Sequence, residues 1–268
     1  MRLFGVIIAL VVCAGIANAQ IKTEYWDASK TKKKGEGETR DDLEHGKWTY
    51  WHENGKIKAT GKYRQGDRDG AWITYYVNGQ KETEGSYTEG LSDGKWSYWY
   101  ENGKLQAKGK YLADDKTGVW TTWYKKGKIG SKIKYKDGMI EGNYIYYYEN
   151  GKVKEEGEIK TGMKHGEYFS FHENGKPHIK GEYFEDEKTG EWIEWNQKKV
   201  MLYKGKFENG FETGPWVYYH ENGKKESEGT YANNSKDGKW YYYDDTGKKL
   251  KEESWRRGKL SRTKKYKK

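Results

Sequence analysis

The chain carries six histidines, the residue type that most often serves as a metal ligand or a general base. His52, His172 and His220 share one place in a repeating pattern, and His45 and His165 share another. At the ~4.8 Å spacing of strands, the five repeats between His52 and His172 separate them by about 48 Å. They cannot ligate one ion, so we expect structural roles at turns and on the surface, and no metal site.

Acidic side chains gather between the repeats, as in the segments 66–69 and 114–117. A calcium loop needs several oxygen ligands at fixed offsets, but these segments vary from copy to copy, and 162–165 contains no acid. A G-x-S-x-G elbow, a phosphate-binding loop and a Cys–His nucleophile pair are also missing from the sequence. We therefore expect no enzyme, no catalytic residue and no cofactor.

Aromatic side chains are the remaining candidates, because 16% of the residues are Phe, Trp or Tyr. One ring recurs at offset 5, counted from the glycine that opens each 24-residue repeat. As an exposed stripe these rings would stack on sugars or grip a partner; alternatively, they stack on one another and shield the second face of a thin sheet. This set, called the ladder below, consists of Trp51, Tyr75, Trp99, Trp123, Tyr147, Phe171, Trp195, Tyr219 and Tyr243.

The elements that position these rings are set by an unbroken spacing of 24 residues between nine glycines, from Gly46 to Gly238. Such a period indicates tandem copies of one unit, each packed on its neighbours. Asn-Gly pairs such as Asn54-Gly55 predict a hairpin in each copy, with a type I′ turn in which both residues take positive φ. The predicted fold is all-β: an elongated, twisted, single-sheet antiparallel β-meander of nine hairpin repeats.

Reflection about the Asn-Gly pair predicts the register, with offset 2 opposite offset 15 and offset 0 opposite offset 17. Offset 2 is Trp or Tyr in every copy, as at Trp48, and offset 15 is glycine in seven of nine copies, as at Gly61. Offset 17 is aromatic in eight of nine copies, as at Tyr63, and pairs with the opening glycine. We therefore expect each large ring to cover the glycine directly opposite it in the same copy.

The first nineteen residues have the pattern of a secretory signal peptide, with Arg2, an apolar run over 3–16 and a predicted cut between Ala19 and Gln20. The lone cysteine, Cys13, would leave with it, and Val12 disfavours its lipidation. The mature chain would then contain a degenerate capping repeat within 20–45, nine repeats over 46–261, a basic tail over 262–268, and no transmembrane segment. In the tail, the lysines that could contact an anionic surface are Lys264, Lys265, Lys267 and Lys268.

The unit G-x-W-x-x-Y/W-x-x-N-G-K, followed by a lone glycine and G-x-Y, resembles the MORN-repeat variant family from residue 46 to about 260. Many bacterial members carry an antitoxin-like label, and related eukaryotic MORN repeats serve as membrane-proximal or protein-contact modules. The resemblance therefore implies a contact module of this kind or an antitoxin. The stretch 238–250 is also similar to choline-binding or glucan-binding wall repeats, which are shorter.

We expect an exported scaffold that binds a protein or cell-envelope partner. The alternatives are a glycan-binding module that uses the ladder and an antitoxin-type protein that binds a toxin. Nucleic acid is not an expected partner of an exported chain.

Overall fold

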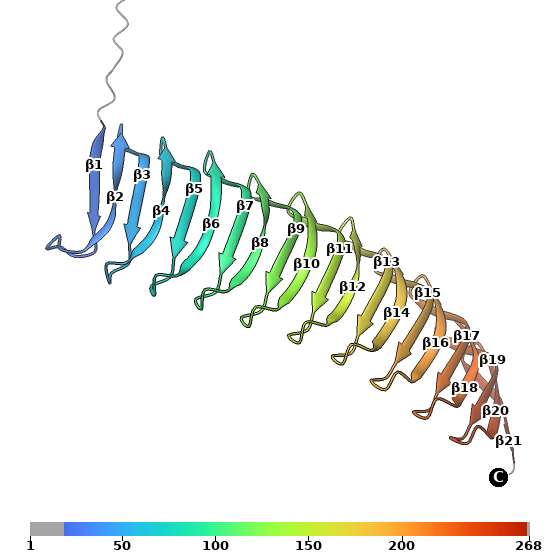
Figure 1. Ribbon diagram of the computed structural model, residues 1–268. Helices are drawn as coiled ribbons and strands as arrows, with labels where there is room; N and C mark the ends of the chain where they lie inside the picture. The colour runs from blue at the N-terminus through green and yellow to red at the C-terminus, as the bar shows by residue number, and fades with distance from the viewer. Residues whose placement is uncertain (1–18, 267–268) are drawn as a thin grey trace, which may run out of the picture.

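The computed structural model describes residues 19–266 as one antiparallel sheet of 21 strands (Figure 1), in which each strand pairs with the next along the chain. No helix occurs within that range, so the predicted fold class is confirmed. The predicted signal peptide up to Asn18, with Cys13, lies outside the described residues, as do Lys267 and Lys268. The strands are β1 (Gln20–Tyr25), β2 (Lys33–Arg40), β3 (Leu43–Trp51), β4 (Ile57–Arg64), β5 (Asp67–Tyr75), β6 (Lys81–Thr88), β7 (Leu91–Trp99), β8 (Leu105–Leu112), β9 (Asp115–Trp123), β10 (Ile129–Lys136), β11 (Met139–Tyr147), β12 (Val153–Lys160), β13 (Met163–Phe171), β14 (Pro177–Phe184), β15 (Glu187–Trp195), β16 (Met201–Glu208), β17 (Phe211–Tyr219), β18 (Lys225–Ala232), β19 (Ser235–Tyr243), β20 (Lys249–Arg256) and β21 (Lys259–Lys265).

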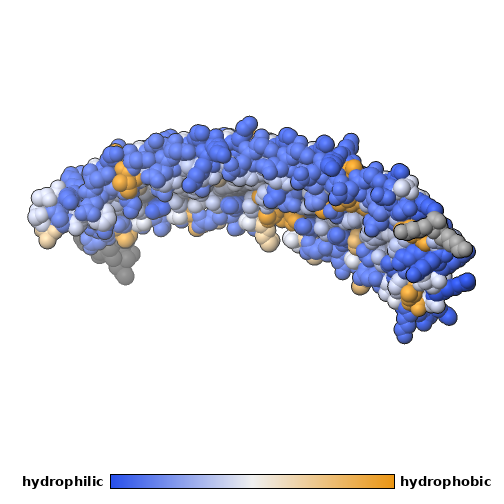
Figure 2. Space-filling model, turned by 90° about the horizontal axis from the view of Figure 1, so that it is seen from below, coloured by the Kyte–Doolittle hydropathy of each residue, from blue (hydrophilic) through white to orange (hydrophobic). Residues whose placement is uncertain are grey.

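The hairpins succeed one another along a curved, twisted array, with β1 and β21 at its two ends (Figure 1). Figure 2 shows this array as an arc whose visible surface is largely hydrophilic, with hydrophobic residues in separate patches. A single layer cannot enclose a thick aliphatic core, so the buried apolar residues are mainly the offset-2 rings. Trp48, Trp192 and Trp240 are at most 1% exposed.

The loop inside each repeat differs from the predicted type I′ turn. The Gly55 N–H donates to the carbonyl of His52 at 2.9 Å, and the His52 N–H donates to the carbonyl of Lys56 at 2.8 Å. Gly55 has a φ of +82°, whereas Asn54 does not have a positive φ. This is a three-residue loop, a type I turn closed by a left-handed glycine. Type I′ geometry lies instead between repeats, where Gln65 and Gly66 have φ values of +52° and +88°.

The asparagine of the Asn-Gly pair joins one repeat to the next. The Oδ1 of Asn102 accepts from the Lys104 N–H at 3.1 Å, and its Nδ2 donates to the carbonyl of Lys125 in the following repeat at 3.1 Å. The Lys104 ammonium donates to the carbonyl of Lys126 at 3.0 Å. The same bonds recur in other repeats, so these Asn and Lys side chains form a row of hydrogen bonds that joins the turns of successive repeats.

Replacing Asn102 by alanine is expected to lower the free energy of unfolding by about 1 kcal/mol, because two exposed hydrogen bonds are lost. Asn102 does not have a positive φ, so alanine adds no backbone strain there. The matched control is Asn102→Asp, which keeps the Oδ1 acceptor and removes only the donor to the next repeat. Urea denaturation should rank wild type above the aspartate variant and the aspartate variant above alanine; equal stability of all three would contradict this role.

The opening glycine of each repeat lies in a bulge. Thr60 pairs with Ile73 and Lys62 pairs with Asp69, so residues 70–72 of β5 face Gly61 alone. Gly70 has a φ of +72°, and a Cβ added to it would contact nothing within 4 Å. The predicted register of offsets 0 and 17 is confirmed, but the prediction that the offset-17 ring covers this glycine is wrong. Glycine is needed there for its left-handed backbone.

An offset-2 tryptophan covers a glycine of the preceding repeat, not the one opposite it in its own repeat. Trp48 does pair with Gly61, as predicted, but a Cβ on Gly61 would overlap the indole of Trp72. The Trp72 indole N–H donates to the carbonyl of Lys62 at 2.9 Å, beside the bulge. The expected same-copy cover is therefore wrong wherever offset 2 is Trp, because the bulge lets that ring lie across the strand before it. It is confirmed for Tyr144, the ring that a Cβ on Gly157 of its own repeat would contact.

This arrangement explains the two copies that lack glycine at offset 15. Ile133 lies before Tyr144, the smaller ring of the next copy, and Glu253 lies in the last copy, which no further offset-2 ring follows. Glu253 is 7% exposed, and Lys251 and the indole of Trp255 both donate to its carboxylate. At these two positions the side chain at offset 15 fits the next repeat; Gly157 precedes another tyrosine, Tyr168, and contacts Tyr144 of its own repeat.

Candidate functional site

Rings from offsets 2, 4 and 17 share one face of the sheet, called the ring face below. They form zigzags of edge-to-face pairs, such as Tyr63 with Trp72 at 5.0 Å and Tyr111 with Trp120 at 4.9 Å between ring centroids. Each such pair contributes roughly 0.5–1.5 kcal/mol beyond its buried area. One run of rings extends over β3–β9 and a second over β13–β19.

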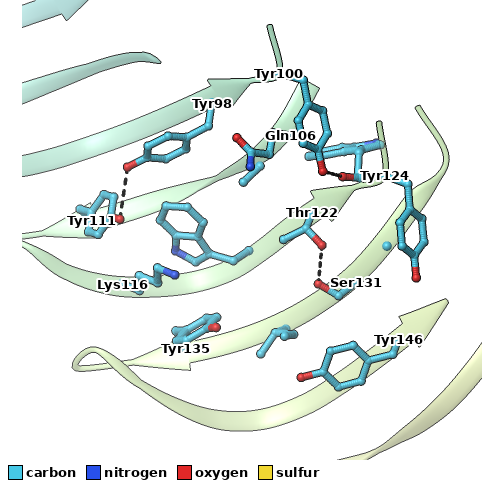
Figure 3. Close-up of a pocket in the computed structure, with 15 residues that line it drawn as sticks. Tyr98, Tyr100, Gln106, Tyr111, Lys116, Thr122, Tyr124, Ser131, Tyr135 and Tyr146 are labelled. Carbon is cyan, nitrogen blue, oxygen red and sulfur yellow. Dashed lines mark hydrogen bonds between the residues drawn. The ribbon is translucent and has the colours of Figure 1, made fainter. Parts of the chain in front are cut away.

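A groove of about 660 Å³ opens on the ring face over β7–β11 (Figure 3). The hydroxyl of Tyr98 donates to that of Tyr111 at 3.3 Å, and the hydroxyls of Thr122 and Ser131 lie 2.7 Å apart. We call the residues that shape its centre the second cup: Tyr98, Ala107, Tyr111, Lys116, Trp120 and Thr122.

A second groove, of about 390 Å³ over β2–β6, includes in its lining the residues 48 positions before those of the second cup, and we call these residues the first cup. Its hydrogen bonds are the same: the hydroxyls of Tyr50 and Tyr63 lie 3.1 Å apart, and those of Thr74 and Thr83 lie 2.8 Å apart. The first cup consists of Tyr50, Ala59, Tyr63, Arg68, Trp72 and Thr74.

The cups alternate with filled positions because two offsets alternate along the chain. Offset 4 runs Tyr50, Thr74, Tyr98, Thr122, Tyr146 and Ser170. Each cup lies where the tyrosine of one copy is followed by the threonine of the next. Offset 22 runs Arg68, Ser92, Lys116, Ile140 and Lys164, so the cation also recurs every second copy up to Lys164; Lys188 in the next copy ends this alternation. Sequence reasoning missed the cups; a comparison of copies two apart, at a period of 48, carries the signal.

Each cup holds one cation against its rings. The Arg68 guanidinium carbon lies 4.7 Å from the centroid of Trp72, and the Lys116 ammonium lies 4.7 Å from that of Trp120. Within residues 19–266 neither cation forms an ion pair with a carboxylate. Rings attract these cations, but they do not neutralise their charge.

Burial is the main influence on the pKa values of this face. It raises the pKa of Tyr98, and the hydrogen bond with Tyr111 adds to the effect. Burial raises the pKa of Tyr144 and Tyr203 to about 12. Burial also lowers the pKa of Lys188, which lies over Trp192. The ring face is therefore partly desolvated, which strengthens charge interactions made on it.

The ladder residues are all half-buried, and within the described range no ring–ring pair joins them. Lysines approach some of them, as Lys81 does at 5.3 Å from the centroid of Trp99. A bulge precedes offset 5, as between Tyr50 and Trp51, which interrupts the alternation of faces. Trp51 and Trp123 accordingly appear among the residues that line the two grooves.

The histidines and the described part of the basic tail, which are the other candidates from the sequence, lie outside the two cups. The Nε2 atoms of His52, His172 and His220 lie 2.7–3.0 Å from the carbonyls of ladder residues in the next repeats. No group of three or more His, Cys, Asp or Glu side chains that could hold a metal occurs in the described part of the chain. Lys264 and Lys265 end β21, which pairs with β20.

No helix that is long and apolar enough to cross a membrane occurs among residues 19–266.

No curated protein matches this chain. Among solved structures it is similar to toxin complexes described as TcdB2-TccC3-Cdc42 and TcdB2-TccC3, each at 10% identity, over 89% and 90% of this chain, with TM-scores of 0.21 and 0.20. The Photorhabdus luminescens Tc holotoxin pore matches over 88% at 7% identity with a TM-score of 0.16. This chain spans only 14%, 14% and 20% of the lengths of those chains, and scores this low carry no argument.

The model of one family, the MORN repeat variant, matches eight segments: 44–65, 68–89, 92–113, 116–137, 140–160, 164–185, 212–233 and 236–257. The interval 186–211 is unmatched and contains Lys198-Lys199 in place of Asn-Gly. Its strands β15 and β16 nevertheless pair in the same register, and Lys199 takes the left-handed φ of +71°. The chain belongs to the MORN repeat variant family.

Proposed function

We propose that the chain is a non-enzymatic, exported scaffold that holds a partner of the cell envelope on its ring face. Membership of a repeat family supports a binding or scaffold role. The observation that carries the proposal is the recurrence, along one face of a long sheet, of half-buried tyrosine rings beside cations that form no ion pair with a carboxylate within residues 19–266. Partly exposed aromatic surface of this kind is typical of contact sites.

Charge reversal on the ring face tests this role. The Lys116→Glu, Lys164→Glu double variant should retain an envelope fraction at least about tenfold less than wild type does, because charge complementarity is inverted at the contact. The matched control, Lys95→Glu with Lys108→Glu, makes the same change in net charge at exposed positions on the opposite face. Equal loss by both double variants would indicate nonspecific attraction and contradict a ring-face site.

Export is supported by the signal-peptide pattern before Gln20. Mass spectrometry of the chain recovered from its native source should find Gln20 as the first residue. A cytoplasmic chain that retains Met1 would favour an antitoxin-type role over this proposal.

Glycan binding by the ladder is a second candidate, because its rings are half-buried and lack ring partners within the described range. Trp99 lies outside the lining of both cup grooves. A variant at Trp99 therefore separates the ladder from the cups.

A further inference from the structure

We infer that the two cups form a bivalent site for an acidic polysaccharide. This inference rests on the proposed binding function and names the class of partner and the residues that take it. The first and second cups are related by 48 residues, which is four strand spacings of ~4.8 Å or about 19 Å along the sheet. Figure 1 shows β3–β11 side by side in similar orientations, so both cups open on the same face.

The chemistry of each cup suits a sugar with a carboxylate. The tyrosine rings of the cups are half-buried and present flat apolar surfaces on which the C–H face of a pyranose can stack, whereas the indoles beneath them are buried. Hydroxyl pairs at Tyr98–Tyr111 and Thr122–Ser131 stand beside those rings as donors and acceptors. The Lys116 ammonium supplies an unpaired cation for a carboxylate, in a charge-assisted hydrogen bond that partial desolvation strengthens.

The first cup carries a more mixed set of charges. Arg68 donates to the hydroxyl of Tyr87 at 2.9 Å, and Lys34 and Lys58 also line the groove. The carboxylate of Glu82 accepts from Thr74 at 3.1 Å and reduces the positive charge there. Its equivalent in the second cup is Gly130, and among the described residues Lys116 is the one charged side chain in the lining of that groove.

Other extended polymers fit the cups less well. A single-stranded nucleic acid needs a groove in which positive charge follows the backbone continuously, but Ser92 replaces the cation between the two cups. An extended peptide binds by adding a strand at a sheet edge, whereas the cups lie on a face whose backbone groups are already paired. The chain's formal charge of +10 favours an anionic ligand.

A third position along the array shows what closes a cup. Offset 13 is Ala59 in the first cup and Ala107 in the second, but it is Glu155 two copies later. The hydroxyl of Tyr168 donates to Glu155 at 3.1 Å. A carboxylate therefore stands where the open cups have a methyl group, and it would repel an acidic sugar. Two cups, not three, form the site.

Calorimetric titration with oligogalacturonates of two lengths tests the inference on the purified full chain. A trimer is expected to bind weakly with two molecules per chain. A dodecamer, which can reach both cups, should bind with one molecule per chain and about 10²–10⁴-fold more tightly, because its second contact is intramolecular. Lys116→Met should reduce the trimer stoichiometry to one and bring the dodecamer affinity close to that of the trimer.

Two controls make the result specific to the cups. Lys188 lies 4.3 Å from the centroid of Trp192 on the same face but belongs to neither cup, so Lys188→Met should bind both oligomers like wild type. Trp99→Ala, in the ladder, should also bind like wild type. For wild type, rising salt should weaken the dodecamer, a readout that needs no variant and remains valid if Lys116→Met fails to fold.

Four outcomes would overturn the inference: a single trimer per wild-type chain, equal loss in Lys188→Met, loss in Trp99→Ala but not in Lys116→Met, or a salt-independent affinity. Tighter binding of poly-glutamate or of a single-stranded oligonucleotide would overturn it in favour of those partners. A chain that binds an envelope fraction through its ring face, but binds no oligogalacturonate, would refute the inference while the proposed function stands.

Discussion

Replacing Gly109 by isoleucine is expected to lower the free energy of unfolding by about 3 kcal/mol or more, as overpacking of a fixed ring does. Even a Cβ at this position would overlap the indole of Trp120. The indole N–H of Trp120 donates to the carbonyl of Lys110 at 3.0 Å, and the side chain is 4% exposed. Displacing the ring would therefore break this hydrogen bond and disturb its packing. Urea denaturation followed by tryptophan fluorescence measures the loss.

The control is a compensating change that the chain itself contains. Ile133 precedes Tyr144, so Gly109→Ile combined with Trp120→Tyr recreates that pair. The double variant should be more stable than the sum of the two single changes predicts, by about 1–3 kcal/mol of coupling. Trp96 lies directly opposite Gly109 in the pairing of β7 with β8. Even so, Trp96→Tyr should show no such coupling with Gly109→Ile. Coupling to Trp96 in place of Trp120 would contradict the packing described here.

The repeat, the strands and their register could be predicted from the sequence because a short hairpin loop restricts its two strands to few alignments. Asn54-Gly55 marks that loop, and the predicted pair Trp48–Gly61 is confirmed. The turn type was wrong for a physical reason. A three-residue loop alone would shift the register by one residue, but the bulge between Tyr50 and Trp51 restores it. Two different turns therefore predict the same strand pairing.

The partner of each ring could not be taken from strand pairing, because pairing describes the backbone and not the direction of a long side chain. The bulge at residues 70–72 lets Trp72 lie over Gly61 of the preceding repeat. The sequence contains part of the correct rule. The two copies without glycine at offset 15 are followed by Tyr144, in the case of Ile133, and by no further offset-2 ring, in the case of Glu253, although Gly157 also precedes a tyrosine. Matching exceptions between neighbouring copies is more informative here than matching the consensus.

The candidate site was harder to predict than the fold. The aromatic content indicated a contact surface, and the ladder was the set named from the sequence; its role in binding stays a prediction. The cups depend on side chains from two neighbouring repeats, such as Tyr98 and Thr122, and on which ring fills the space beside them. A consensus taken over all nine copies conceals the period of 48 residues, because it combines the copies that have tyrosine at offset 4 with those that have threonine there.

Raising the pH above about 10, the ordinary pKa of tyrosine, is expected to unfold the whole array. Burial raises the pKa of many ring-face tyrosines, to about 12 for Tyr144 and Tyr203. Since the folded chain holds these protons more tightly than the unfolded chain does, their stabilisation is full below pH 10 and is lost as pH rises through the folded-state values. Lys188 acts in the opposite sense, because burial lowers its pKa and the folded chain releases its proton first. The tyrosines outnumber such lysines, so their effect decides the direction.

Absorbance at 295 nm and far-UV circular dichroism, recorded together, measure this transition. Tyrosinate absorbance from the ring face should rise only as the sheet signal is lost, in one step above pH 11. The Tyr98→Phe variant removes one ionising hydroxyl that burial and Tyr111 keep protonated, so its loss of sheet signal should occur at higher pH than in wild type. Titration of every tyrosine near pH 10 with the sheet intact would show that the ring face is open to water, and the buried hydroxyl pairs that define the cups would then be absent in solution.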